Sequence, residues 1–95
     1  MQNVLNFQNY LRNNQIFSQY NLKRIGVFGS FARDEANTND IDILIEDDID
    51  PNKLIELKLL LENSLQKKID VVLKKFANPI ILHRAQKDMY YATQY

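Results

Sequence analysis

The spacing of hydrophobic positions changes several times along the chain, and each spacing predicts a different element. Residues 2–13 place apolar side chains three and four positions apart, which is typical of one helical face. Residues 23–29 (KRIGVFG) read as a short buried strand, and residues 40–46 (DIDILIE) alternate strictly, as a strand does. Residues 30–36 contain helix-forming side chains, and residues 36–39 (ANTN) are typical of a turn. The first half therefore predicts a helix, a strand, a short helix and a second strand.

A further short helix is predicted between the first helix and the first strand. Asn13 and Asn14 can end the first helix or cap the next, whose apolar residues are Ile16, Phe17 and Tyr20. Asn21 suits a left-handed turn before the strand.

The second half begins its helices with an aspartate or asparagine followed by proline. Asp50-Pro51 and Asn78-Pro79 both combine a capping residue with proline at the first helical position. Between these helices, residues 68–74 (KIDVVLK) predict a third strand. The first of the two helices directs four leucines inward, Leu54, Leu57, Leu61 and Leu65, and the last is expected to run to residue 92 with Ile81, Leu82, Ala85, Met89 and Ala92 facing in. The sequence thus predicts one α/β domain over residues 1–95, with a three-stranded sheet flanked by helices.

Composition narrows the function classes. The chain has 95 residues, 45% hydrophobic and 25% charged, as expected for a globular fold. Twelve basic and twelve acidic residues give no net charge, so direct DNA binding is not expected, although a nucleotide ligand is not excluded. The absence of cysteine excludes disulfides and thiolate zinc sites and fits a cytoplasmic protein. Neither a membrane-spanning run nor a signal peptide is expected.

Two acidic residues on the second strand form the first candidate site. Asp40 and Asp42 are two positions apart, so both carboxylates point to one face of the strand, while Ile41 and Ile43 point to the other. Adjacent carboxylates repel each other unless a cation lies between them, and hard oxygen ligands suit Mg²⁺ or Mn²⁺. An exposed polar strand face without a ligand is the alternative, and for this triplet alone it is the better interpretation.

The turn before these acids is the second candidate. Gly29 and Ser30 follow the first strand directly, where backbone N–H groups at a helix start can bind an anion and glycine lets a phosphate approach. An ordinary strand-to-helix turn, capped by Ser30, is the alternative. Arg33 lies one helical turn later and could either bind a phosphate or pair with Asp40 or Glu35.

The third candidate is Asp70, which stands among apolar residues of the third strand. Burying an aspartate there is costly without a partner, and a metal shared with Asp40 and Asp42 would supply one. A strand-edge aspartate that reaches solvent is the alternative. Together, an anion-binding turn, a carboxylate pair and a third carboxylate are what two-metal nucleotidyl transfer requires.

These residues resemble a known family. The pattern G-S-x-A-R-x-E-A, a short turn and then D-I-D-hydrophobic resembles the minimal nucleotidyltransferases of the DNA-polymerase-beta superfamily, the MNT-domain antitoxins that pair with HEPN-domain toxins. The resemblance covers nearly the whole chain and implies a polymerase-beta-like nucleotidyltransferase fold with a mixed sheet. By position, Gly29 and Ser30 correspond to the nucleotide-gripping pair, Asp40 and Asp42 to the metal pair, and Asp70 to the third acid.

The resemblance also implies a reaction and a partner. An antitoxin of this type would use two Mg²⁺ ions, or Mn²⁺, to transfer AMP from ATP to a tyrosine hydroxyl of a HEPN ribonuclease and so neutralise it. Larger members add a domain that holds the acceptor, so here the acceptor is expected on a partner. The chain departs from the family at Asp34, commonly glycine, and at Asn39, commonly serine. Two alternatives stay open: an antitoxin that blocks its toxin by contact alone, and an aminoglycoside-type transferase acting on a small molecule.

Overall fold

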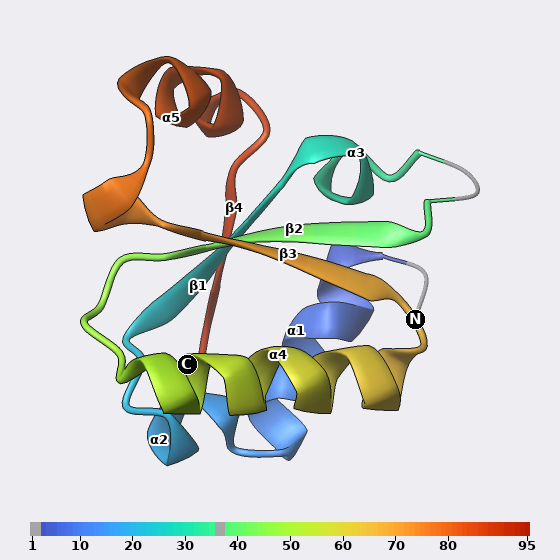
Figure 1. Cartoon of the computed structure of the whole chain (residues 1–95). Coiled ribbons are helices and arrows are strands. Elements are labelled where there is room, and N and C mark those ends of the chain that lie inside the picture. The colour runs from blue at the N-terminus through green and yellow to red at the C-terminus, as the bar shows by residue number, and fades with distance from the viewer. Residues whose placement is uncertain (1–2, 36–37) are drawn as a thin grey trace.

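A mixed four-stranded sheet with helices on both sides forms the body of the protein (Figure 1). The computed structural model describes residues 3–35 and 38–95. The sheet order is β3-β2-β1-β4, in which β2 and β3 are parallel and the other two pairs are antiparallel. The mixed sheet implied by the family resemblance is therefore confirmed. The strands are β1 (Arg24–Phe28), β2 (Asp40–Ile45), β3 (Lys68–Leu73) and β4 (Tyr90–Thr93).

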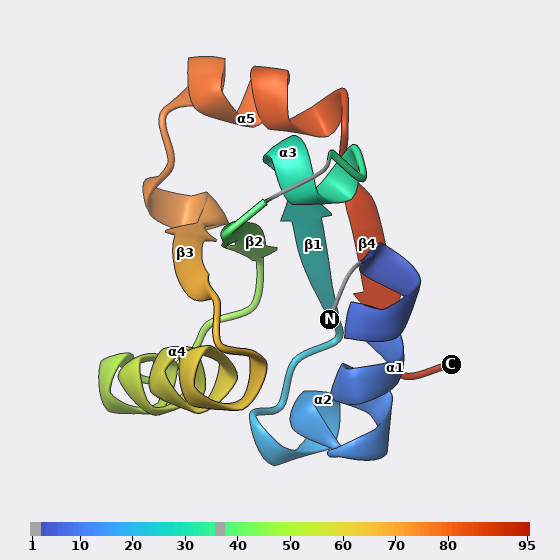
Figure 2. The same ribbon diagram turned by 90° about the vertical axis from the view of Figure 1, so that its right-hand side faces the viewer.

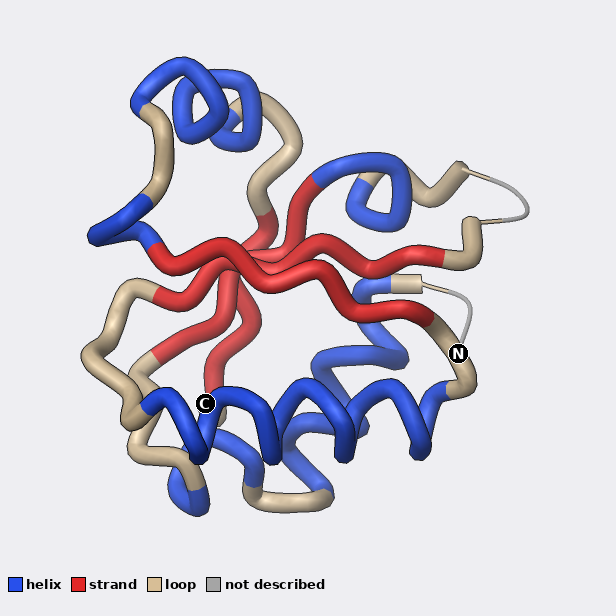
Figure 3. Tube along the Cα trace, viewed as in Figure 1, coloured by secondary structure: helices blue, strands red, loops and turns tan. Residues whose placement is uncertain are grey.

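The helices divide between the two sides of the sheet, as Figure 2 and Figure 3 show from two directions. On one side lie α1 (Val4–Asn13), α2 (Ile16–Gln19) and α4 (Pro51–Leu65). On the other lie α3 (Gly29–Ala32), which follows β1 directly, and α5 (Pro79–Gln86), which lies above the sheet. A single 3₁₀ turn, η1 (Lys74–Phe76), follows β3.

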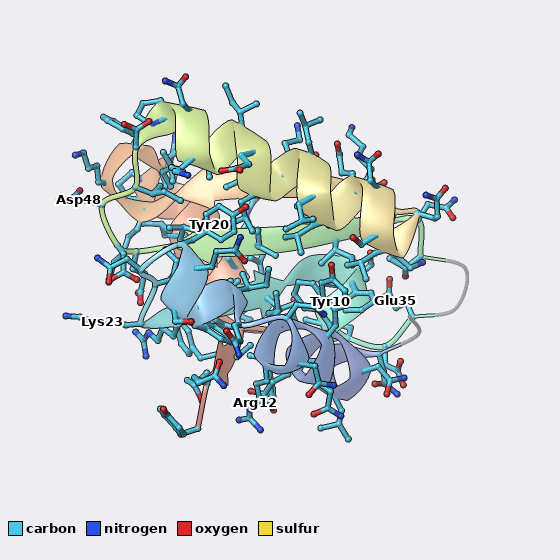
Figure 4. All side chains as sticks on the ribbon, turned by 90° about the horizontal axis from the view of Figure 1, so that it is seen from below. Tyr10, Arg12, Tyr20, Lys23, Glu35 and Asp48 are labelled. Carbon is cyan, nitrogen blue, oxygen red and sulfur yellow. The ribbon has the colours of Figure 1, made fainter. Side chains whose placement is uncertain are left out.

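The main core lies between the sheet and the helices α1, α2 and α4. The alternation of β2 buries Ile41, Ile43 and Ile45 on this face, as the sequence predicted. They join Leu57 and Leu61 of α4, which have no exposed surface. Seen from below in Figure 4, Tyr10 and Tyr20 lie between α4 and the α1–α2 pair, and Tyr20 is buried in the core. The opposite face of the sheet carries the buried Leu44 together with polar side chains such as Asp42.

The two cap-and-proline signals are confirmed. The Asp50 carboxylate accepts a hydrogen bond of 2.7 Å from the backbone N–H of Asn52 at the start of α4. Asn78 accepts one of 2.8 Å from the N–H of Ile80 at the start of α5. Asn21 has the expected left-handed backbone, with φ of 56°.

The last helix is shorter than predicted, and a fourth strand takes its place. The helix α5 ends at Gln86, and the chain then forms β4 on the open edge of β1. Ala92 is buried as expected, but from a strand position opposite Ile25. Ile81, expected to face inward, is 51% exposed. Pairing with β1, where aromatic residues fit well, outweighs the helical preference.

The helix α3 is also shorter than predicted. The predicted helix 30–36 is one turn that begins at Gly29, with Phe28 at the N-cap and no side-chain cap. Ser30 therefore does not cap it, because it already stands inside the turn. Of the predicted turn 36–39, residues 36 and 37 lie outside the described residues. Within the described ranges, no helix is long and apolar enough to span a membrane.

Candidate active site

Two of the predicted acidic residues are direct neighbours in the sheet. Asp42 of β2 and Asp70 of β3 are register partners in the parallel pair. Neighbouring strands lie about 4.8 Å apart, and partners in register point to the same face, so the two side chains stand side by side. Both side chains are partly buried, and that of Asp70 is 41% exposed. The alternation of each strand sends these carboxylates away from the isoleucine core.

The charge of this pair is poorly compensated by the protein. Burial raises the pKa of the Asp42 carboxyl above its ordinary value, and the neighbouring Asp70 raises it further, by its negative charge and by hydrogen bonding to the protonated form. Asp40 adds a smaller effect in the same direction, while Arg33 lowers the pKa. Two carboxylates that resist ionising together are a place where a cation would be stabilised.

Asp40 is on the same face but stands further into solvent. Its register partner is Lys68, whose Nζ lies 3.7 Å from an oxygen of Asp70. Across residues 3–35 and 38–95, no three acidic or histidine side chains come close enough together to hold a metal ion as they stand. The Asp42–Asp70 pair nevertheless fits a hard divalent cation, because it supplies adjacent carboxylate oxygens whose charge Lys68 and Arg33 compensate only in part. A third ligand from Asp40 would require that side chain to turn toward the pair.

Gly29 approaches the Asp42 carboxylate so closely that a side chain would not fit. Phe28 is the register partner of Asp42, and Gly29 follows it at the end of β1. A Cβ atom on Gly29 would overlap Oδ2 of Asp42. The φ of Gly29 is +75°, a conformation that residues with side chains rarely adopt. The sequence therefore needs glycine here for two independent reasons, and the predicted turn and acid pair lie side by side.

Arg33 ends the α3 turn and pairs with two carboxylates. Its Nε donates to Glu35 at 2.9 Å and its Nη1 to Asp88 at 2.8 Å. These two hydrogen bonds, that to Glu35 first, raise the pKa of Arg33 further above its ordinary value. The predicted pair with Glu35 is present, and Asp88 is a partner that the sequence did not suggest. The next residue, Asp34, has φ of 58°, a left-handed conformation that favours glycine.

A cavity of about 240 Å³ opens between this turn and α5. Phe28, Gly29 and Arg33 line it from the α3 side. The helix α5 contributes Ile81, Arg84 and Ala85, and Asp88 follows from the turn just after it. Arg84 and Asp88 were not among the predicted site residues. Their spacing with Ile81 and Ala85 was the available signal, because it places both charges on the predicted inner face of the last helix.

Comparisons with known proteins identify the family of the chain. The family model described as "Polymerase beta, Nucleotidyltransferase" matches residues 9–90. MJ0126 of Methanocaldococcus jannaschii, provisionally named a protein adenylyltransferase, is 38% identical over 81 residues, which is 81% of this chain and 83% of that protein. The protein adenylyltransferase MntA of Thermococcus cleftensis is 38% identical over 63 residues, covering 63% of this chain and 64% of that protein.

Solved structures share the fold at lower sequence identity. A toxin–antitoxin crystal structure with AMP-PNP contains a chain that matches with a TM-score of 0.66 at 21% identity, covering 90% of this chain and 71% of that one. The Shewanella oneidensis complex of a tri-AMPylated HEPN toxin with its MNT antitoxin matches with a TM-score of 0.57 at 23% identity, covering 90% and 71%. Because the family model matches residues 9–90, the chain belongs to the polymerase beta nucleotidyltransferase family.

Proposed function

We propose that this protein is an antitoxin that transfers AMP from ATP to a hydroxyl group of a partner HEPN toxin and so neutralises it. It would do so as a single nucleotidyltransferase domain over residues 1–95. The observation that carries the proposal is the placement of Asp42 and Asp70 in register on one face of the sheet, with the Gly29 turn against them.

The turn after β1 would hold the nucleotide. Gly29 has no side chain, so the triphosphate can approach the backbone, and the hydroxyl of the next residue, Ser30, would bind it as well. Arg33 lines the same cavity and would contribute N–H donors that Glu35 and Asp88 leave unused. These contacts would orient the α-phosphorus toward the acids on β2 and β3.

Asp40, Asp42 and Asp70 would hold two Mg²⁺ ions, or Mn²⁺ in their place. When bound, such ions offset the negative charge that builds on the phosphoryl oxygens and lower the pKa of the attacking hydroxyl. Asp70, on the outer strand, would assist removal of the proton from the acceptor hydroxyl. The hydroxyl oxygen then bonds to the α-phosphorus while the bond to pyrophosphate breaks, so that AMP is transferred and pyrophosphate leaves.

Two kinds of likeness support the choice of acceptor. Relatives at 38% identity bear the name protein adenylyltransferase, and a fold neighbour forms a complex with a HEPN toxin that carries AMP groups. The sheet in the described ranges leaves Asp70 on the strand at its edge, where a hydroxyl from another protein could reach it. We place the reaction in the cytoplasm, where ATP is abundant and where a chain without cysteine is well suited.

The proposal is tested by incubating the protein with the purified HEPN partner and ATP labelled at the α-phosphate, and following the label on the partner. Wild-type protein should label it. Asp70→Asn should bind ATP but transfer AMP about 10²–10⁴ times more slowly, because the lost group acts mainly in the transition state. Asp48→Asn, the same chemical change at an aspartate that is 88% exposed and pairs with Lys75, is the matched control and should label normally.

The outcomes separate the alternatives. A wild-type protein that neutralises the toxin without ever labelling it would show that contact alone is the mechanism. Label on an aminoglycoside but never on the toxin would favour a small-molecule acceptor instead. Equal rates for Asp70→Asn and wild type would remove Asp70 from the reaction.

A further inference from the structure

Two arginines line the cavity beside the Gly29 turn, and their surroundings differ. Arg33 is paired with Glu35 and Asp88, so its positive charge is already compensated within the protein. Arg84, on α5, makes no ion pair and no side-chain hydrogen bond with any residue in the ranges 3–35 and 38–95, and it is exposed. A negatively charged ligand in this cavity would therefore contact one arginine whose charge no carboxylate of the described residues compensates.

The position of Arg84 is held by the residues around it. Ile81, Arg84 and Ala85 lie three and four positions apart on the face of α5 that lines the cavity, and Asp88 joins them from the turn after the helix. Ala85 is only 6% exposed, and Asp88 binds Arg33 of the α3 turn at 2.8 Å. The salt bridge thus ties the end of α5 to the turn that carries Gly29. Arg84 precedes Asp88 by four positions, and the helix that carries it, α5, lies above the α3 turn (Figure 2).

The charge balance of the cavity indicates which part of a nucleotide it suits. With Arg33 neutralised by Glu35 and Asp88, Arg84 is the remaining positive charge in the lining, and the acids on β2 and β3 add negative charge nearby. Its volume of about 240 Å³ lies below the roughly 300–1,000 Å³ typical of sites for whole small molecules, so it would accept part of a nucleotide. A guanidinium binds phosphate oxygens through paired, charge-assisted hydrogen bonds.

We propose that Arg84 is a nucleotide-binding residue that contacts the phosphate chain of ATP from the α5 side of the cavity. This inference rests on the proposed function, since it assigns a further residue to the same site. Arg84 distinguishes nucleotides by their phosphates, so it favours ATP over adenosine. Arg33 has a structural role besides its remaining N–H donors, because its salt bridge to Asp88 holds the end of α5 against the turn.

The test measures binding of ATP with Mg²⁺ and, separately, of adenosine, by calorimetry on three proteins. Arg84→Gln should bind ATP about 10–100 times more weakly than wild type, the size of one charged hydrogen bond, and bind adenosine unchanged. Lys87→Gln, the same loss of charge at an exposed residue just after α5 that does not line the cavity, should change both affinities by less than about twofold. All three should melt at the same temperature, which excludes a folding defect.

If Arg84→Gln binds ATP as well as wild type does, or loses affinity for ATP and adenosine equally, the role of Arg84 is overturned. The proposed function is left intact by either result. A further arm uses Arg84→Lys, which keeps the charge and should recover part of the lost ATP affinity. A wild-type protein that binds no ATP at all would overturn the proposed function and this inference together.

Discussion

Gly29→Ala offers the sharpest test of the site geometry, because two separate features of the structure oppose a side chain at this position. The φ of +75° costs an L-residue about 1–2 kcal/mol. Replacing glycine also restricts the unfolded chain, which stabilises by about 0.4–1 kcal/mol and offsets part of this cost. The backbone alone should therefore cost about 1 kcal/mol, and displacement of Asp42 by the new Cβ adds to it.

The expected effect is large enough to measure. The entropy of unfolding is about 0.2 kcal/mol/K for a chain of 95 residues, so 1 kcal/mol corresponds to about 5 °C in Tm. Calorimetry should show Gly29→Ala melting at least about 5 °C below wild type and binding ATP with Mn²⁺ at least about tenfold more weakly, because the Asp42 carboxylate is moved.

Gly26→Ala is the matched control in β1. Its Cβ would meet Sδ of Met89 at 2.6 Å, the flexible end of a side chain that can move, and Cβ of Leu44 at 3.2 Å, while Gly26 does not have a positive φ. Because it makes no contact with Asp42, we expect unchanged nucleotide affinity even where the contact with Leu44 lowers its Tm. In an Asp42→Ala background, Gly29→Ala should cost less than in wild type, because the carboxylate it would overlap is gone. If Gly29→Ala melts and binds like wild type, the close approach of the turn to Asp42 is refuted.

Three further predictions concern charge. In chelator at pH 7, Asp42→Asn should melt above wild type, because the raised pKa of Asp42 means that its ionisation destabilises the fold. The gain in Tm should shrink as the pH falls through that pKa, and a gain that persists in acid would contradict the reasoning. Glu46→Gln should lower the Tm at pH 7, because hydrogen bonds from Arg24 and then Lys74 lower the pKa of Glu46 and so stabilise the fold when it is ionised. The variant and wild type should melt together once the pH falls below that lowered pKa. Mn²⁺ at ten times its dissociation constant should stabilise wild type by about 1.4 kcal/mol, or about 7 °C, in thermal melts, and an equal shift in Asp42→Asn would place the metal elsewhere.

The acid pair could be predicted from the sequence because strand alternation alone decides which way Asp42 and Asp70 point. Their exact pairing could not, since register depends on how α4 returns the chain to the sheet. The same limit applies at the end of the chain. Met89 and Ala92 are three positions apart, which fits a helix, and only the open edge of β1 makes residues 90–93 a strand.

Two features of the arginines also could not be predicted from the sequence: the pairing of Arg33 with Asp88 and the place of Arg84 at the cavity. Glu35 is near Arg33 in the chain and was named as a candidate, whereas Asp88 is 55 positions away and meets it only because α5 lies over the α3 turn. Arg84 is brought to the cavity by the same arrangement. Local pattern thus predicted the residues on β2 and β3 and the turn after β1, while those that depend on the packing of α5 required the fold.

The register between β2 and β3 has a consequence for how this protein can evolve. Because Asp42 and Asp70 face each other across neighbouring strands, their separation is set by the spacing of the sheet and not by the length of the connection between them. That connection includes the exposed Asp48 and the whole of α4. Insertions or deletions beside Asp48 should therefore change loop length over generations while leaving the two carboxylates in place, so lineages can diverge in this segment and retain the same chemistry.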